Sequence, residues 1–168
     1  MHVDRDPEMC VVALEKKAKA RLSNLDIWNE GVEELSFTPE SLAACTCIHA
    51  LYTFPKPQEI LKKIYGWLTP GGYGIFVDPG RPVRVLDWQI AIGRQMLKTH
   101  GLKKTLQVMK EGKEVSKQNR RAAKMQATGT FWVYSHKEFC KSVENAGFVI
   151  EESWTTFRGI SDLVVVRK

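Results

Sequence analysis

The sequence lacks any apolar run long enough to cross a membrane as a helix. Its longest uncharged stretch, Ser41 to Pro55, has fifteen residues and contains His49 and several small polar side chains. The first residues, Met-His-Val-Asp-Arg-Asp, lack the apolar segment and the small-residue cleavage site of a secretory signal. Four cysteines are too few for a disulfide framework in 168 residues. These absences favour a cytoplasmic domain with reduced thiols.

Composition excludes several classes of protein. Apolar residues make up 43% and charged residues 26% of the chain, which are ordinary values for a globular protein. Collagen-like, low-complexity and disordered proteins are thereby excluded. The length suffices for one domain with a hydrophobic core, and no internal repeat or linker divides the sequence. We therefore expect a single domain over residues 1–168.

The net charge of +6 is concentrated in one segment. Residues 94–124 contain ten Lys and Arg residues and two Glu residues, a net +8, whereas the remainder has 15 basic and 17 acidic residues, a net −2. Such a segment attracts nucleic acid, an anionic surface or an acidic small molecule, but it is also typical of a solvated helical face. No aromatic residue lies between 98 and 128, which disfavours stacking on single-stranded nucleic acid.

Helical and strand-like patterns alternate along the chain, which is typical of a layered α/β fold. Capping residues and apolar spacing predict helices at 7–22, 57–68, 83–128 and 136–146. Strands are predicted at 25–28, 42–48, 73–78, 148–151 and 163–166. Because residues 42–48 are mostly small and apolar, we expect this strand to be buried on both faces.

The order of three motifs carries a resemblance to a known family. Residues 3–9 (Val-Asp-Arg-Asp-Pro-Glu-Met) join an acidic strand end to a helix, residues 33–51 join a loop to a strand, and residues 64–79 hold Leu-Thr-Pro-Gly-Gly before a strand. Over about eighty residues this resembles a class I S-adenosylmethionine-dependent methyltransferase, of the small-molecule type that includes quinone-biosynthesis enzymes. The resemblance implies a Rossmann-like α/β sheet with helices on both faces. It also implies a helical insertion, residues 83–128, after the family's fifth strand.

The family's first strand and the glycine loop after it are absent from this chain. In the family this strand lies near the middle of the sheet, so its absence leaves backbone groups of its neighbours unpaired, at about 1–3 kcal/mol for each buried group. The resemblance therefore implies an oligomer in which a partner chain or a second copy supplies the strand. The alternatives are that the sheet is repaired in another way or that the chain is part of a longer protein.

The resemblance also implies a site for S-adenosylmethionine. Asp4 has the position of the acid that holds the ribose hydroxyls of the cofactor, and Arg5 has the position of a residue against the adenine. The other implied cofactor-binding residues are Gly31, Val32, Glu33, Cys47 and Ile48. Because Gly31 and Ala43 replace acids that are common in the family, adenine recognition departs from the family pattern.

Methyl transfer depends mainly on alignment of the acceptor, and a base helps when the acceptor is a hydroxyl or phenol. His49, at the end of the 42–48 strand, is the candidate catalytic base, and Tyr52, Asp78 and His136 are weaker candidates. The predicted acceptor-binding residues are Tyr52, Asp78, Trp88 and Trp132. A hydrogen-bonded strand end is the alternative for His49, and core packing is the alternative for the tryptophans.

Cys45, Cys47 and His49 alternate along one predicted strand and would project from one face. No fourth ligand accompanies them and their spacing differs from that of zinc sites, so we expect packed thiols and no metal. The predicted function is methyl transfer to a small-molecule acceptor, with residues 83–128 as a lid. The alternatives are a degenerate subunit that supports a partner, and an RNA-directed methyltransferase that uses the basic segment.

Overall fold

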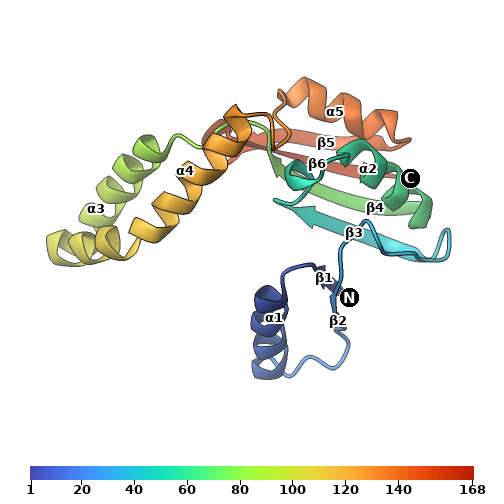
Figure 1. Cartoon of the computed structure of the whole chain (residues 1–168), viewed down its shortest axis with the longest axis horizontal. Helices are drawn as coiled ribbons and strands as arrows, with labels where there is room; N and C mark the ends of the chain where they lie inside the picture. The colour runs from blue at the N-terminus through green and yellow to red at the C-terminus, as the bar shows by residue number, and fades with distance from the viewer.

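The computed structural model describes residues 1–168, and it contains two separate β-sheets (Figure 1). The smaller sheet pairs β1 (His2–Asp4) with β2 (Ile27–Asn29) in parallel, and helix α1 (Pro7–Lys19) connects the two strands. Helix α1 begins where Asp6 accepts a hydrogen bond from the Glu8 backbone N–H. This N-terminal unit lies beside the rest of the molecule rather than within its main sheet.

The larger sheet has four strands in the order β3-β4-β6-β5. Its strands are β3 (Leu42–Ile48), β4 (Leu68–Pro79), β5 (Val149–Thr156) and β6 (Ser161–Arg167). β3 is parallel to β4, whereas β6 is antiparallel to both β4 and β5. This mixed sheet confirms the predicted α/β class, and it leaves β3 as an edge strand.

Two helices, α2 (Pro57–Trp67) and α5 (His136–Asn145), cover one face of the larger sheet. Helix α2 begins at a proline, which the first helical turn tolerates because its N–H has no helical partner. Helix α5 begins with the predicted capping box. The core joins both helices to the sheet through Ile60, Leu61, Phe76, Phe139, Val143, Val164 and Val166.

The opposite face of this sheet remains open. Tyr73 and Ile75 of β4 and Trp154 of β5 are exposed there, and Ile48 of β3 is 60% exposed. The prediction that β3 is buried on both faces is therefore wrong, because this strand has one sheet neighbour and a helix layer on one side only. The expected helices on both faces are likewise found on one face of the four-stranded sheet.

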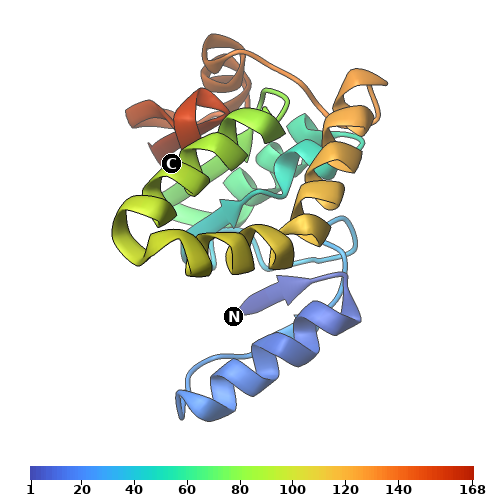
Figure 2. The same cartoon turned by 90° about the vertical axis from the view of Figure 1, so that its left-hand side faces the viewer.

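Residues 83–128 are helical as predicted, and they form a hairpin of α3 (Val85–Glu111) and α4 (Lys113–Ala127). Figure 1 shows the hairpin extending outward beyond the carboxyl ends of β3 and β4, and in Figure 2 it lies in front of the larger sheet. Helix α3 is interrupted at Gly101, whose φ of 75° is left-handed. Although α3 has 27 residues, neither it nor any other helix is long and apolar enough to cross a membrane.

Several predicted boundaries shift. Helix α1 ends at Lys19 rather than near Leu22, because Arg21 takes a left-handed backbone conformation with a φ of 54°. The Thr-Pro-Gly-Gly segment at 69–72, which lies between the predicted helix 57–68 and the predicted strand 73–78, is the first part of β4. β5 and β6 are longer than predicted because they pair with each other along most of their length.

Gly80→Ala should destabilise the fold. A Cβ at Gly80 would overlap the Tyr134 ring at Cε2 and lie 2.7 Å from the Tyr134 backbone oxygen, and the backbone contact cannot be relieved by a rotamer change. We expect the free energy of unfolding in urea to fall by about 1–3 kcal/mol. Gly66→Ala in α2 is the matched control, because a Cβ at Gly66 meets no atom within 4 Å. The higher helix propensity of alanine should stabilise this variant by about 0.5–1 kcal/mol. Equal stability of Gly80→Ala and the natural protein would contradict the packing of Tyr134.

Candidate functional site

A cavity of about 260 Å³ lies at the carboxyl ends of β3 and β4, between these strand ends and the helical hairpin. His49 follows β3 and Pro79 ends β4, while Trp88 of α3 and Gln126 of α4 contribute from the hairpin. The short helix η2 (Phe157–Gly159) and the start of β6 complete the wall. The carboxyl ends of parallel strands are the usual position of ligands in α/β sheets.

His49 is held at the mouth of β3 by its backbone. Its N–H donates to Val77 O at 2.7 Å, and its φ of 54° turns the chain away from the strand direction. Its ring lies 5.0 Å from the Phe157 ring between centroids, and Nε2 is 3.4 Å from Ser161 Oγ. Burial lowers the pKa of His49 below its ordinary 6.5, so the imidazole is neutral at pH 7 and can accept a proton.

Asp78 is fully buried on β4, and its carboxyl group has no hydrogen bond of normal geometry. Burial raises its pKa to about 7 from an ordinary 3.8, although the Tyr134 hydroxyl and the backbone N–H groups of Tyr52, Ala50 and Leu51 lie near enough to lower it in part. The Tyr134 hydroxyl also lacks a well-formed hydrogen bond. Asp78 is therefore a buried group that exchanges its proton near neutral pH.

Asp162 lies opposite Asp78 in the β4–β6 ladder, and it is also fully buried. Two nitrogens of Arg81 donate to its carboxylate at 2.6 and 3.0 Å, and His136 Nδ1 lies 2.9 Å from Oδ1. Its charge is thus compensated, whereas that of Asp78 is not. His136, a weaker candidate for the base, is engaged with Asp162 and does not line the cavity.

Five of the predicted cofactor-binding residues meet in the N-terminal unit. Asp4 ends β1, and one of its carboxylate oxygens accepts from the Asp6 N–H at 2.9 Å. Arg5 forms an ion pair with Glu33 at 2.7 Å, and its guanidinium carbon lies 5.7 Å from the centre of the Phe54 ring. Gly31 and Val32 directly precede Glu33, and Glu30 N donates to Asp4 O at 3.1 Å.

This N-terminal unit is anchored to the core. Lys63 of α2 donates to Glu33 O at 2.6 Å, and Val3 and Val32 pack against the core cluster. The last two predicted cofactor-binding residues, Cys47 and Ile48, lie on β3, which has no hydrogen-bonded strand on the side away from β4. The predicted residues thus form two groups, one at the end of β1 and in the loops beside the small sheet, the other on β3 of the large sheet.

The thiols of β3 face the core. Cys45 and Cys47 pack against the core cluster, and burial raises their pKa values to about 11 and about 12. His49 lines the cavity instead, so the three residues that alternate in sequence do not form a ligand cluster. The two cysteines therefore act as small packing groups in the neutral form.

The predicted acceptor residues separate into two groups. Tyr52 and Trp88 line the cavity, whereas Asp78 is buried beside Tyr52. Trp132 lies outside the cavity wall. Its backbone N–H donates to Tyr52 O at 2.9 Å, and the centroid of its ring is 4.3 Å from that of Tyr134, so Trp132 packs at the border of the core.

Sequence analysis missed Asn119, Gln126, Phe157 and Ser161, which also line the cavity. Asn119 and Gln126 are seven residues apart on α4 and therefore lie on one helical face. This spacing was a detectable signal within a stretch that has few apolar residues. The contributions of Phe157 and Ser161 depend on the β5–β6 turn, which has no comparable sequence pattern.

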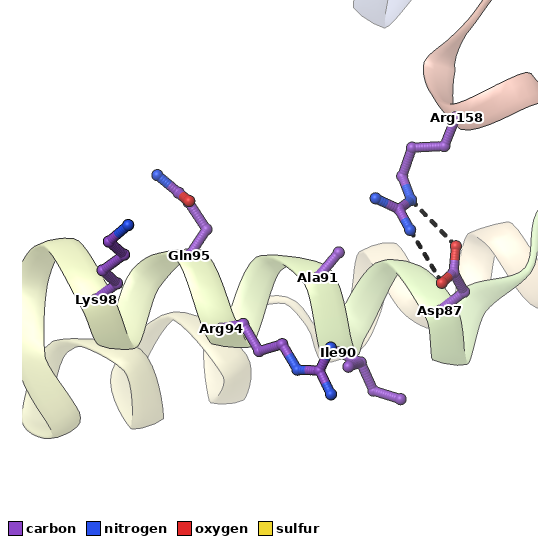
Figure 3. A pocket seen from close by; sticks show the side chains of 7 residues that line it. All are labelled: Asp87, Ile90, Ala91, Arg94, Gln95, Lys98 and Arg158. Atoms are coloured by element: carbon purple, nitrogen blue, oxygen red, sulfur yellow. Dashed lines mark hydrogen bonds and ion pairs between the residues drawn. The ribbon is translucent and has the colours of Figure 1, made fainter.

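A second hollow lies on the outer surface of α3. Figure 3 shows Arg158 paired with Asp87, with two contacts of 3.1 Å, and Lys98 on the same side of the helix. Arg94 projects to the opposite side. These basic side chains do not converge on one point, and the remaining basic residues of 94–124 are exposed along both helices. The structure therefore gives no support to the RNA-directed alternative.

Comparisons with known proteins find methyltransferases that share this fold. A family model described as a methyltransferase domain matches residues 1–76. A SAM-dependent methyltransferase of Aquifex aeolicus has a TM-score of 0.60 at 14% identity, covering 98% of this chain and 66% of that chain. An S-adenosylmethionine-dependent methyltransferase of Mesorhizobium loti has a TM-score of 0.57 at 17% identity, and the match covers 99% of this chain and 78% of that chain. A methyltransferase candidate of Haloferax volcanii, solved in complex with the Trm112 methyltransferase activator, has a TM-score of 0.58 at 16% identity. That match covers 98% of this chain and 70% of that chain.

These likenesses show the Rossmann-like fold of class I methyltransferases, as the sequence resemblance implied. The chain spans 66% and 52% of the first two solved chains that it matches. A search of curated proteins finds no match.

Asp78→Asn should change how stability depends on pH. The folded chain holds the Asp78 proton up to a pH of about 7, and the unfolded chain holds it only to about 3.8. This stabilisation is complete below pH 3.8 and is lost as the pH rises through 7. The free energy of unfolding of the natural protein should therefore fall relative to Asp78→Asn by roughly 1–3 kcal/mol between pH 5 and pH 8. Urea titrations at both pH values measure this difference in the free energy of unfolding, and Asp26→Asn is the control because Asp26 is exposed. A constant difference between Asp78→Asn and the natural protein would contradict the burial of an uncompensated carboxyl group.

Proposed function

We propose that this chain, whose residues 1–76 match a methyltransferase-domain family, takes part in S-adenosylmethionine-dependent methyl transfer to a small-molecule acceptor. The cavity at the carboxyl ends of β3 and β4 carries the proposal, because it lies where this fold brings an acceptor to the end of the sheet. Its volume of about 260 Å³ is near the lower end of ligand pockets, which favours a small acceptor.

The N-terminal unit offers groups that fit the cofactor. Asp4 ends a parallel strand with one carboxylate oxygen bound to the Asp6 N–H, and its second oxygen has no partner in the chain. A carboxylate in this position accepts hydrogen bonds from the hydroxyls of a ribose. Arg5 and Phe54 provide flat groups beside it for an adenine. We therefore assign the adenosyl end of S-adenosylmethionine to Asp4, Arg5 and the 31–33 loop.

The cofactor supplies a methyl group that is already activated by a sulfonium, so the chain has to orient the acceptor and handle a proton. Trp88 and Tyr52 form walls that orient the acceptor and exclude water. His49 lies at the mouth of β3 as a neutral imidazole, and Nε2 accepts the proton that a hydroxyl acceptor releases. Asp78, beside Tyr52, holds a second exchangeable proton behind this wall.

We further propose that a strand from a second copy of this chain completes the sheet at β3. The outer edge of β3 has no partner, and the sheet face beside it exposes Ile48, Tyr73 and Ile75. An unpaired edge next to an apolar face is a template for strand addition. The Haloferax volcanii neighbour, which is solved with an activator protein, supports a role for a partner in this fold.

Binding of S-adenosylmethionine tests the proposed function. At a hundred times its Kd, the cofactor should raise the free energy of unfolding by about 2.7 kcal/mol, which a thermal shift detects. Asp4→Ala should lose this stabilisation because it removes the ribose acceptor. Asp26→Ala is the control, since Asp26 lies at the other end of the same small sheet, just before β2. Equal shifts for the two variants would overturn the Asp4 assignment, and no shift in the natural protein at millimolar cofactor would overturn the proposed function.

Strand addition is tested at Thr46. Because His49 N–H faces β4, the alternation along a strand directs the Thr46 N–H toward the open edge. Thr46→Pro removes this outward donor and should block edge pairing. We expect a dimer for the natural protein and a monomer for Thr46→Pro in light scattering, with Thr46→Val as control because it keeps the N–H. A natural protein that is monomeric at tens of micromolar, or a dimeric Thr46→Pro, contradicts pairing through this edge.

A further inference from the structure

Gln126 is a buried amide whose carbonyl oxygen is unused. The residue is 5% exposed and lines the cavity from α4. Its Nε2 donates to Pro79 O at 3.2 Å. Because a backbone carbonyl only accepts hydrogen bonds, this contact fixes which end of the amide is nitrogen. The other end, Oε1, is therefore an acceptor, and it has no hydrogen-bond partner in the chain.

The rest of the cavity wall carries no charge. None of its twelve residues is Asp, Glu, Lys or Arg, and its histidine, His49, is neutral at pH 7 because burial lowers its pKa. Trp88 and Phe157 are the largest apolar members, accompanied by Val83, Ile92 and Ile160. Such a wall binds a flat apolar body and rejects an ion, since a buried charge without a partner is strongly disfavoured.

We propose that Gln126 is the specificity-determining residue of the acceptor site, and that the acceptor is an uncharged, flat apolar molecule that carries, besides the group presented to His49, a hydroxyl or N–H group. Gln126 Oε1 accepts the hydrogen bond of that group while Nε2 stays on Pro79 O. This inference rests on the proposed function only in naming the cavity as the acceptor site. It goes further by fixing the charge, shape and hydrogen-bonding character of what enters.

Indole and benzofuran are suitable probes because they have the same shape and differ in the N–H donor. We expect indole to bind about tenfold or more tightly than benzofuran, since one buried acceptor is satisfied by indole alone. Indole-2-carboxylate, which is anionic, should bind more weakly than indole. Titrations followed through the Trp88 side-chain N–H signal by NMR, without cofactor, give the affinities and show that the probe is in this cavity.

Gln126→Leu should abolish the preference for indole, because it weakens the binding of indole and leaves the binding of benzofuran unchanged or tighter. The matched control is Gln118→Leu, because Gln118 is an exposed glutamine on the same helix. Equal binding of indole and benzofuran by the natural protein overturns the proposal without the use of any variant. A preference that persists in Gln126→Leu, tighter binding of the carboxylate, or no binding of any probe also overturns it. Because no cofactor is present, these outcomes are independent of whether the chain transfers a methyl group.

Discussion

The structure depends on how two aspartates are accommodated side by side in the centre of its sheet. Asp78 and Asp162 are opposite each other across β4 and β6, and both are fully buried. A buried carboxylate is tolerated only when it is paired or protonated. Asp162 is paired, through Arg81 and His136, which connects the end of β4 and the start of α5 to β6. Asp78 has no cationic partner and holds its proton instead.

This asymmetry orders the site around it. Arg81, two residues after the end of β4, also donates to Gly159 O at 2.7 Å, so the pairing of Asp162 fixes the turn that brings Phe157 to the cavity. Tyr134, packed on Gly80, covers Asp78 from the other direction. The cavity wall thus comes from segments that are far apart in sequence, and one compensated carboxylate keeps two of them in position. Its uncompensated neighbour remains available for proton exchange.

The elements that local chemistry defines could be predicted from the sequence, whereas burial could not. Pro57, the Asp6 cap and the Ser135 capping box begin helices through contacts within a few residues, and those helices are present. The composition of residues 42–48 predicts that they form a strand. The exposure of β3, however, depends on neighbouring elements that the sequence of the strand does not encode. Asp4 and His49 could be selected as strand ends. Gln126 could not, because its unused oxygen follows from a contact with Pro79, 47 residues away.

The separation of the two sheets has an energetic consequence for the proposed cofactor site. Asp4 ends β1 of the small sheet and Arg5 follows it, whereas the proposed acceptor cavity is built on the large sheet. The two parts are linked by side-chain contacts such as Lys63 to Glu33 O and Arg5 on Phe54. A strand that binds at β3 and orders this boundary reduces the conformational freedom that a bound cofactor would otherwise remove. Strand addition and cofactor binding then favour each other by the same free energy, because such coupling is reciprocal. With the strand addition proposed above, the affinity for the cofactor would therefore depend on the chain that pairs with β3.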